Sequence, residues 1–157
     1  MSMTIRPVVT GDIADMLGMV TALSAHHDDV ATVTSVELER DVCGPDPWAI
    51  GLIVRDGTRA VGYAILSRLI CLQRGERGFD IHHLYVVDDL RGQGVGRALI
   101  MAAADTARAY GCSDLRISAA PTNTDAQAAY LACGFATAPN SAARFLMPLG
   151  QAGAATS

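Results

Sequence analysis

The sequence predicts an α/β (α+β) fold with a mixed, mostly antiparallel central sheet of six to seven strands and about four flanking helices. Three strand-like segments follow one another through loops too short for a helix, which makes them antiparallel. A strand, a Gly-rich turn, a long helix and a further strand come next, and this β-α-β unit makes its two strands parallel. With 157 residues, of which 50% are hydrophobic and 18% charged, the chain is large enough for one core.

The N-terminal part begins with a predicted short strand at residues 3–9, MTIRPVV. A helix is predicted to open at Thr10, with Asp12 in its first turn as a favourable charge. Apolar residues at helical spacing mark its buried face: Ile13, Met16, Leu17, Val20 and Leu23. After a polar stretch, residues 35–42 predict a second short helix that ends at Cys43-Gly44-Pro45.

The middle of the chain predicts two strands around a turn at Asp56-Gly57, the strongest short signal for a hairpin. A third strand covers residues 79–87, and a long helix covers about residues 94–110. Residues 113–120 predict a further strand, residues 123–134 a helix closed by Gly134, and residues 143–149 a last strand. We expect one domain over residues 1–150 and a flexible tail over residues 151–157.

Charge and composition argue against several classes of partner. The net charge of −4 and a pI of about 5.4 disfavour nucleic acid as a partner. The sequence has neither the long apolar core of a signal peptide nor a membrane span, so no membrane partner is expected. Its four cysteines form no CxxC pair, which gives no signal for zinc or redox chemistry and predicts reduced thiols in a cytoplasmic protein: Cys43, Cys71, Cys112 and Cys133.

The most informative segment is LYVVDDLRGQGVGRAL, residues 84–99, where glycines and arginines stand between a strand and a helix. Backbone N–H groups at a helix start have no helical partner, and the helix dipole makes them favour a phosphate. Glycine lets an anion approach this backbone closely. A dinucleotide GxGxxG loop would need glycine where the chain has Arg97, and a Walker A ending is absent. The segment therefore predicts a phosphate or pyrophosphate site of another kind.

The glycine segment fits the pattern R/Q-x-x-G-x-G/A, with Arg91, Gly94 and Gly96 at its fixed positions. A second motif follows later in the chain: Asn123, then Tyr130 seven residues on, then the pair Gly134-Phe135. With these two motifs, the sequence resembles the GCN5-related N-acetyltransferase (GNAT) superfamily over nearly its whole length. The resemblance implies the GNAT fold, with a sheet splayed in the middle, and acetyl-CoA as co-substrate without a metal. Residues 38–65 look like the branch of diamine and thialysine acetyltransferases, although Cys43-Gly44 replaces a Phe-Gly pair.

By the same resemblance, the backbone of Leu84 to Val87 holds the pantetheine arm like an added strand, and an N–H near Val86 or Val87 polarises the thioester carbonyl. The glycine loop holds the pyrophosphate. Asn123 matches a family residue near the cofactor arm, and it can also cap the helix that starts near Thr124. The predicted cofactor residues are Leu84, Tyr85, Val86, Val87, Arg91, Gly92, Gln93, Gly94, Val95, Gly96, Arg97 and Asn123.

For catalysis, Tyr130 matches the family's general acid, and the alternative is a tyrosine packed on the core. The diamine branch has an acidic pair where this chain has His82-His83, which puts polyamine substrates in doubt. Arylalkylamine acetyltransferases place a histidine where His83 falls, so His83 is the favoured base and His82 the second choice, against a structural histidine. Strand alternation points the two rings to opposite faces unless a bulge intervenes.

The acceptor is expected to be the primary amine of a small molecule, which receives the acetyl group directly from the thioester. Glu37, Glu39 and Asp41 either receive a cationic amine or form a solvated helix face, and Trp48 either walls the acceptor pocket or lies in the core. The alternatives are a peptide or protein amine as acceptor, and a non-catalytic acyl-CoA sensor.

The resemblance also implies a homodimer, built on the sheet edge or by exchange of the C-terminal strand. Residues 26–29, HHDD, are expected to be a solvated helix end and not a metal site.

Overall fold

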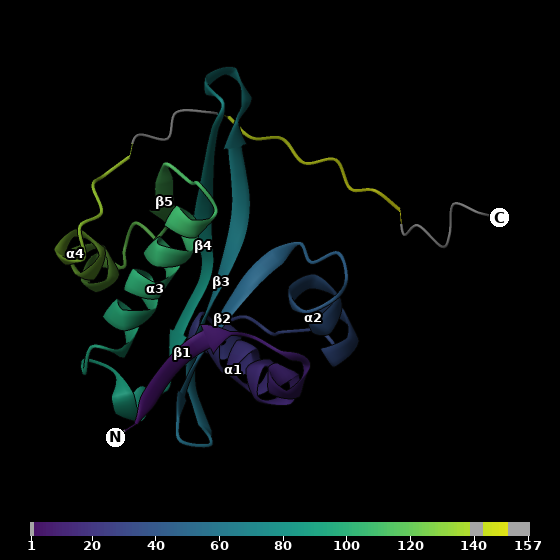
Figure 1. The fold of residues 1–157 in the computed structure, drawn as a ribbon, viewed down its shortest axis with the longest axis vertical. Helices are drawn as coiled ribbons and strands as arrows, with labels where there is room; N and C mark the ends of the chain where they lie inside the picture. Colours follow the sequence, from purple (N-terminus) through teal and green to yellow (C-terminus); the bar gives the residue numbers. More distant parts are fainter. Residues whose placement is uncertain (1, 139–142, 151–157) are drawn as a thin grey trace.

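A computed structural model describes residues 2–138 and 143–150 and shows one five-stranded sheet with the order β1-β2-β3-β4-β5 (Figure 1). Its first four strands are antiparallel, and β5 runs parallel to β4, as the β-α-β unit predicts. The bounds of the strands are β1 (Met3–Pro7), β2 (Ala49–Asp56), β3 (Arg59–Cys71), β4 (Glu76–Val86) and β5 (Asp114–Ile117).

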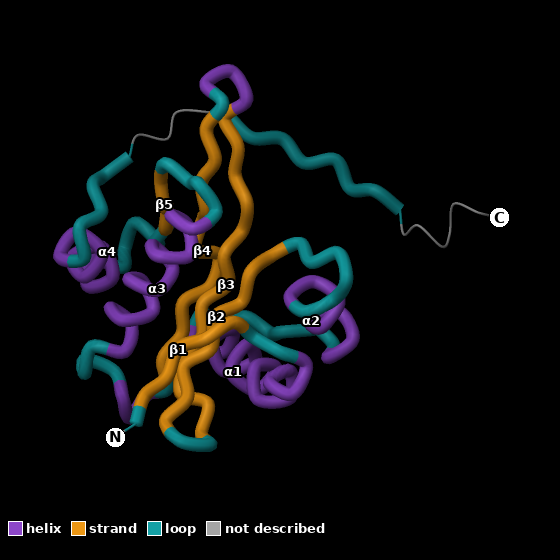
Figure 2. The backbone as a smooth tube through the Cα atoms, in the orientation of Figure 1, coloured by secondary structure: helices purple, strands orange, loops and turns teal. Residues whose placement is uncertain are grey.

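In the described part of the chain, four α-helices flank the sheet, two on each face (Figure 2). On one face, α1 (Ile13–His26) and α2 (Ser35–Val42) enclose an apolar cluster that includes Met16, Ile53 and Tyr63. On the other face, α3 (Val95–Ala109) packs against the middle strands and α4 (Thr124–Ala132) lies beside it. In the ranges that the structure describes, none of the helices is long and apolar enough to cross a membrane.

The prediction of six to seven strands is wrong, since the sheet has five. The last predicted strand, residues 143–149, pairs with no other strand in the described part of the chain, and its large side chains Phe145, Leu146 and Met147 are exposed. A strand needs a neighbour for its backbone hydrogen bonds, but β5 offers an edge of only four residues, and Pro148 lacks one N–H donor. The tail predicted for residues 151–157 lies outside the described residues.

Asp12 has a larger structural role than the helix-start charge that the sequence predicts. A 3-10 turn covers Thr10–Asp12, and α1 begins at Ile13. The buried Asp12 carboxylate accepts hydrogen bonds from Arg6 at 2.6 and 2.9 Å, from Arg55 at 2.8 Å and from the Val9 N–H at 2.9 Å. These bonds keep the pKa of Asp12 well below its ordinary value, and they fasten the start of α1 to β1 and β2.

Candidate active site

A β-bulge in β4 decides where the two neighbouring histidines point. In the β3–β4 ladder Ile65 stands opposite His83 and Leu66 opposite Ile81, so His82 is an extra residue. The side chains therefore change faces: Ile81 packs in the cluster under α3, whereas His83 lies on the α1 face. The two imidazole rings do not diverge, but stack with centroids 4.5 Å apart and planes 19° apart.

Beside this bulge, the pairing between β4 and β5 ends and the two strands separate. Their parallel pairing ends at Ile81 and Ile117, while β4 continues to Val86. The Val87 N–H donates to the Val61 carbonyl at 3.0 Å, so by alternation the backbone groups of Leu84 and Val86 face the side that β5 leaves open. Of the two amides predicted to polarise the thioester, that of Val87 is thus engaged in the sheet, and that of Val86 faces the open edge.

The glycine loop ends in a helix start with free backbone donors. Gly92 and Gly94 have φ angles of 75° and 87°, which residues with a side chain rarely adopt. Gly94 is the N-cap of α3 and has no side chain that could accept a hydrogen bond from the first turn. The first helical bond is donated by Ala98 to the Gly94 carbonyl at 3.0 Å, so the N–H groups of residues 95–97 have no helical partner. This geometry suits an anion at the start of α3.

Hydrogen bonds from three polar side chains hold this loop against neighbouring parts of the chain. Arg91 donates to the Val86 carbonyl, pairs with Asp88 at 3.1 Å and lies 5.8 Å from the ring centroid of Tyr85. Gln93 donates to the Asp89 carbonyl at 3.2 Å. Arg97 donates to the Ala132 carbonyl at 3.3 Å and so connects the start of α3 to the end of α4. The buried side chains of Val95 and Tyr85 pack in the two apolar clusters.

Several predicted site residues meet around a hollow of about 340 Å³, here called the small hollow. Tyr130 lies on its wall, half-buried, with its ring edge-on to Phe135, and burial raises the pKa of Tyr130 above its ordinary value. The Oδ1 atom of Asn123 accepts from the Ala126 N–H at 3.1 Å and caps α4. The other predicted residues on this wall are His82, His83, Leu84 and Asn123.

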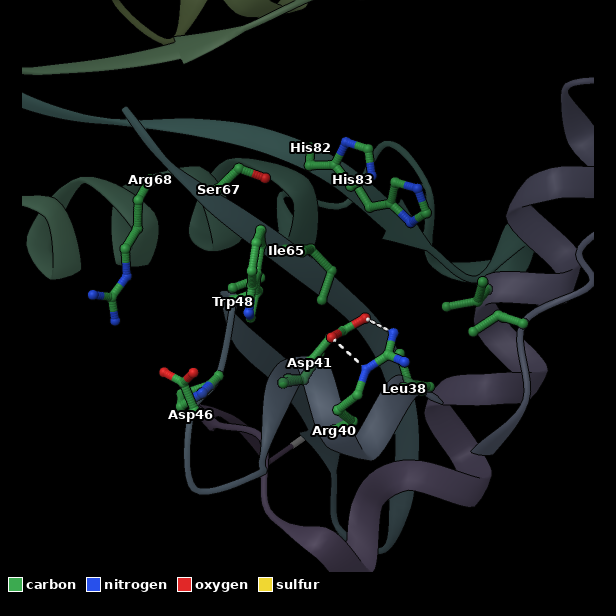
Figure 3. A pocket seen from close by; sticks show the side chains of 15 residues that line it. Leu38, Arg40, Asp41, Asp46, Trp48, Ile65, Ser67, Arg68, His82 and His83 are labelled. Carbon is green, nitrogen blue, oxygen red and sulfur yellow. Dashed lines mark hydrogen bonds and ion pairs between the residues drawn. The ribbon is translucent and has the colours of Figure 1, made fainter. Parts of the chain in front are cut away.

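A second hollow of about 1050 Å³, the large hollow, lies between α2 and the sheet (Figure 3). Trp48 is 79% exposed there, so it forms a wall of the hollow and is not part of the core. Asp41 also lines it and is bound twice by Arg40 at 2.9 Å, which holds the pKa of Asp41 below its ordinary value. Glu37 instead caps α2 through Thr34, and Glu39 is not among the lining residues.

His82 and His83 line both hollows and mark the place where they meet. The buried Tyr63 hydroxyl lies 3.0 Å from Nδ1 of His83. Burial, with the nearby His82 and His27, lowers the pKa of His83 to about 4, so this ring is neutral at pH 7.

Three residues at this place were not predicted from the sequence. His27 and Asp29 lie on the wall of the small hollow, although their segment has the pattern of a solvated helix end. Tyr63 reads as an ordinary apolar strand residue, and no local pattern shows its contact with a histidine twenty positions later. Over residues 2–138 and 143–150, no group of three or more His, Cys, Asp or Glu side chains has an arrangement that could hold a metal ion.

The chain is similar in sequence to a known family of enzymes. The model of the acetyltransferase (GNAT) family matches residues 19–135. This chain belongs to the GNAT family. Members of this family use acetyl-CoA as co-substrate, and this GNAT protein is an acyltransferase.

Named relatives of this GNAT protein acetylate amines. It is 33% identical over 140 residues to an aminoglycoside N(6')-acetyltransferase type 1 of Klebsiella aerogenes, with 83% of this chain and 88% of the relative covered. It is 27% identical over 143 residues to the thialysine N-epsilon-acetyltransferase of Sus scrofa, covering 85% and 84%. That enzyme belongs to the branch that the sequence predicts.

Solved structures support the fold of this GNAT protein. A ribosomal-protein-alanine N-acetyltransferase from Brucella melitensis biovar Abortus 2308 superposes with a TM-score of 0.72 at 24% identity, covering 92% of this chain and 100% of that one. An aminoglycoside acetyltransferase from an uncultured soil metagenomic sample, in complex with sisomicin, superposes with a TM-score of 0.77 at 16% identity, covering 94% and 97%.

Proposed function

We propose that this acetyltransferase transfers the acetyl group of acetyl-CoA directly to the primary amine of a small molecule. The observation that carries the proposal is that His82 and His83 line both hollows. A thioester in the small hollow and an amine in the large hollow would meet beside these two rings. Residues 1–150 are proposed to work as one N-acetyltransferase domain.

The cofactor would lie along the open side of β4 and across the start of α3. The backbone groups of Leu84 and the N–H of Val86 face that open side and can bond the pantetheine arm as an added strand would, whereas the Val86 carbonyl already accepts from Arg91. The free N–H groups at the start of α3 would hold the pyrophosphate, with Arg91 beside them. The wider proposed set is Leu84, Tyr85, Val86, Val87, Arg91, Gly92, Gln93, Gly94, Val95, Gly96, Arg97 and Asn123.

The chemistry needs two proton movements. An ammonium group cannot attack, so a ring nitrogen of the His82–His83 pair first removes one proton from it. The amine nitrogen then forms a bond to the thioester carbonyl carbon, and the N–H of Val86 stabilises the negative charge on the oxygen. The C–S bond breaks, and the Tyr130 hydroxyl, which stays protonated at neutral pH, donates to the leaving sulfur. The amide loses its extra proton to solvent.

The character of the large hollow supports a small acceptor. It has room for a drug-sized molecule, and its lining combines apolar side chains and the exposed ring of Trp48 with two carboxylates and two guanidinium groups, those of Asp41, Asp46, Arg40 and Arg68. Arg40 already pairs with the Asp41 carboxylate, so Asp46 and the indole face of Trp48 are the groups that would attract an ammonium group. The relatives named for aminoglycosides and thialysine also act on amines that are small molecules.

A panel of amines tests this function, with acetyl-CoA consumption and thiol release as the readout and mass spectrometry to confirm each product. The panel holds aminoglycosides, lysine analogues, arylalkylamines, polyamines and short peptides with a lysine or a free N-terminus. Turnover of a small amine well above acetyl-CoA hydrolysis supports the proposal. Turnover of the peptides alone would replace the small acceptor by a protein amine.

We further propose a cytoplasmic homodimer. Four free thiols are typical of a reducing compartment. The outer edge of β5 and the apolar residues 143–149 would find partners in a second copy of the chain.

A further inference from the structure

Tyr63 and His83 form a cross-strand pair between β3 and β4. In this ladder Tyr63 stands opposite Tyr85 and Ile65 opposite His83, so Tyr63 and His83 are diagonal neighbours on one face. The Tyr63 hydroxyl oxygen lies 3.0 Å from Nδ1 of His83. The bulge makes this contact possible. In a regular strand, side chains two positions apart lie on the same face, so His83 would lie with Ile81 on the face that α3 covers.

The direction of this hydrogen bond follows from the burial of Tyr63. Its side chain has no solvent exposure, and burial raises its pKa, so the hydroxyl keeps its proton. Across residues 2–138 and 143–150, Nδ1 of His83 is the sole hydrogen-bond partner of this hydroxyl. If Nδ1 carried a hydrogen and donated it, the O–H of Tyr63 would lack an acceptor in the core, an arrangement that folded proteins avoid. Tyr63 therefore donates, and Nδ1 accepts.

We propose that Tyr63 is a positioning residue that holds His83 in the Nε2–H tautomer, so that His83 presents a hydrogen-bond donor to the hollows and His82 is the base that deprotonates the amine. The proposal rests on the proposed acetyl transfer for the role of His82, but the tautomer of His83 is a property of the enzyme alone.

The electronic reason is simple. A neutral imidazole has one N–H and one nitrogen with a free lone pair, and in His83 the lone pair is already used by Tyr63. Nε2 of His83 therefore cannot take a proton, although it can donate to the thioester oxygen as negative charge develops there. His82 is exposed and makes no side-chain hydrogen bond within the described residues, so its ring has a free lone pair. The ammonium proton would pass to that nitrogen and then to solvent.

Nitrogen NMR of the histidine-labelled enzyme tests the tautomer without any substrate. At neutral pH we expect Nε2 of His83 to show a bonded hydrogen and Nδ1 to show a free lone pair, with the signals assigned by their loss in His83→Gln. Tyr63→Phe should move both nitrogens toward the average of the two tautomers. Tyr85→Phe is the matched control, because it removes a hydroxyl from the same cluster and should leave the His83 signals in place.

Kinetics of two matched glutamine variants test the division of roles. The side-chain amide of His83→Gln can replace the Nε2–H donor, so we expect its kcat to fall by about tenfold, whereas His82→Gln has no base and should lose about 100-fold. A hydrogen on Nδ1 of His83 in the wild type, or the opposite order of the two variants, would overturn the proposal. Absence of turnover with every amine would count against the proposed function, while the tautomer would still be measured.

Discussion

At the scale of single residues, a substitution at Tyr130 can distinguish a catalytic role of its hydroxyl from a packing role of its ring. Its ring packs edge-on against Phe135, and the residue lines the small hollow. Tyr130→Phe keeps the ring and removes the acid, so we expect kcat to fall by about 100-fold with little change in KM for acetyl-CoA. Tyr110→Phe, which alters a tyrosine packed on Phe79, is the control. Full activity in Tyr130→Phe would mean that this side chain only packs.

Asp12 provides a test of stability at the same scale. Asp12→Asn leaves Arg6 and Arg55 beside a buried neutral group, so the free energy of unfolding should fall by about 3 kcal/mol at pH 7. Asp15→Asn is the matched control: this carboxylate also pairs with Arg55 but is 54% exposed, and its loss should cost less than about 1 kcal/mol. Urea titration measures both values, and equal losses would contradict the buried network.

The same group predicts a dependence on pH. The folded pKa of Asp12 is depressed, so its contribution is complete above the unfolded pKa of about 3.9 and is lost as the pH falls toward the folded value. The difference in stability between the wild type and Asp12→Asn should therefore shrink below about pH 4. A difference that stays constant from pH 7 to pH 3 would show that the Asp12 charge is not responsible.

At the scale of elements, the start of α3 offers a variant that changes stability and binding in opposite directions. Gly96 has no positive φ angle, and an added Cβ would only touch Val86 at 3.8 Å. Gly96→Ala should thus stabilise the helix by about 0.5–1 kcal/mol, yet place a methyl group over the proposed pyrophosphate site and weaken acetyl-CoA binding.

The control for this element is Gly18→Ala in α1, where an added Cβ also meets nothing within 4 Å. It should give a similar gain in stability with unchanged acetyl-CoA affinity. Thermal unfolding and calorimetric titration measure the two quantities. Unchanged affinity in Gly96→Ala would place the pyrophosphate elsewhere.

Elements also show what could be predicted from sequence. The hairpin, the β-α-β unit and the glycine loop were predictable because turn residues and apolar periodicity are local signals. The bulge at His82 and the contact of Tyr63 with His83 depend on the pairing of two strands, which no single segment encodes. The separation of β4 from β5 was implied by the family resemblance alone. Residues 143–149 have the composition of a strand, but composition does not show which edge of a sheet, if any, such a segment pairs with.

At the scale of the whole molecule, the exposed residues 143–149 bear on the proposed homodimer. Phe145, Met147 and Leu149 alternate along this segment and are 96%, 79% and 85% exposed, and in Figure 1 the segment runs away from the body of the protein. Such apolar side chains favour association, and the open edges of β1 and β5 provide sites for an added strand. In the homodimer, residues 143–149 of each copy are therefore expected to pack against an edge of the sheet in the other copy.

Light scattering after size-exclusion chromatography tests this expectation. The wild type should elute with the mass of two chains, whereas the double variant Phe145→Asp with Met147→Asp should elute as a monomer, because a buried charge without a partner opposes association. Val30→Asp is the control, since it charges an equally exposed apolar residue in the loop between α1 and α2. A dimer that persists in the double variant would remove this segment from the interface, and a monomeric wild type would contradict the homodimer itself.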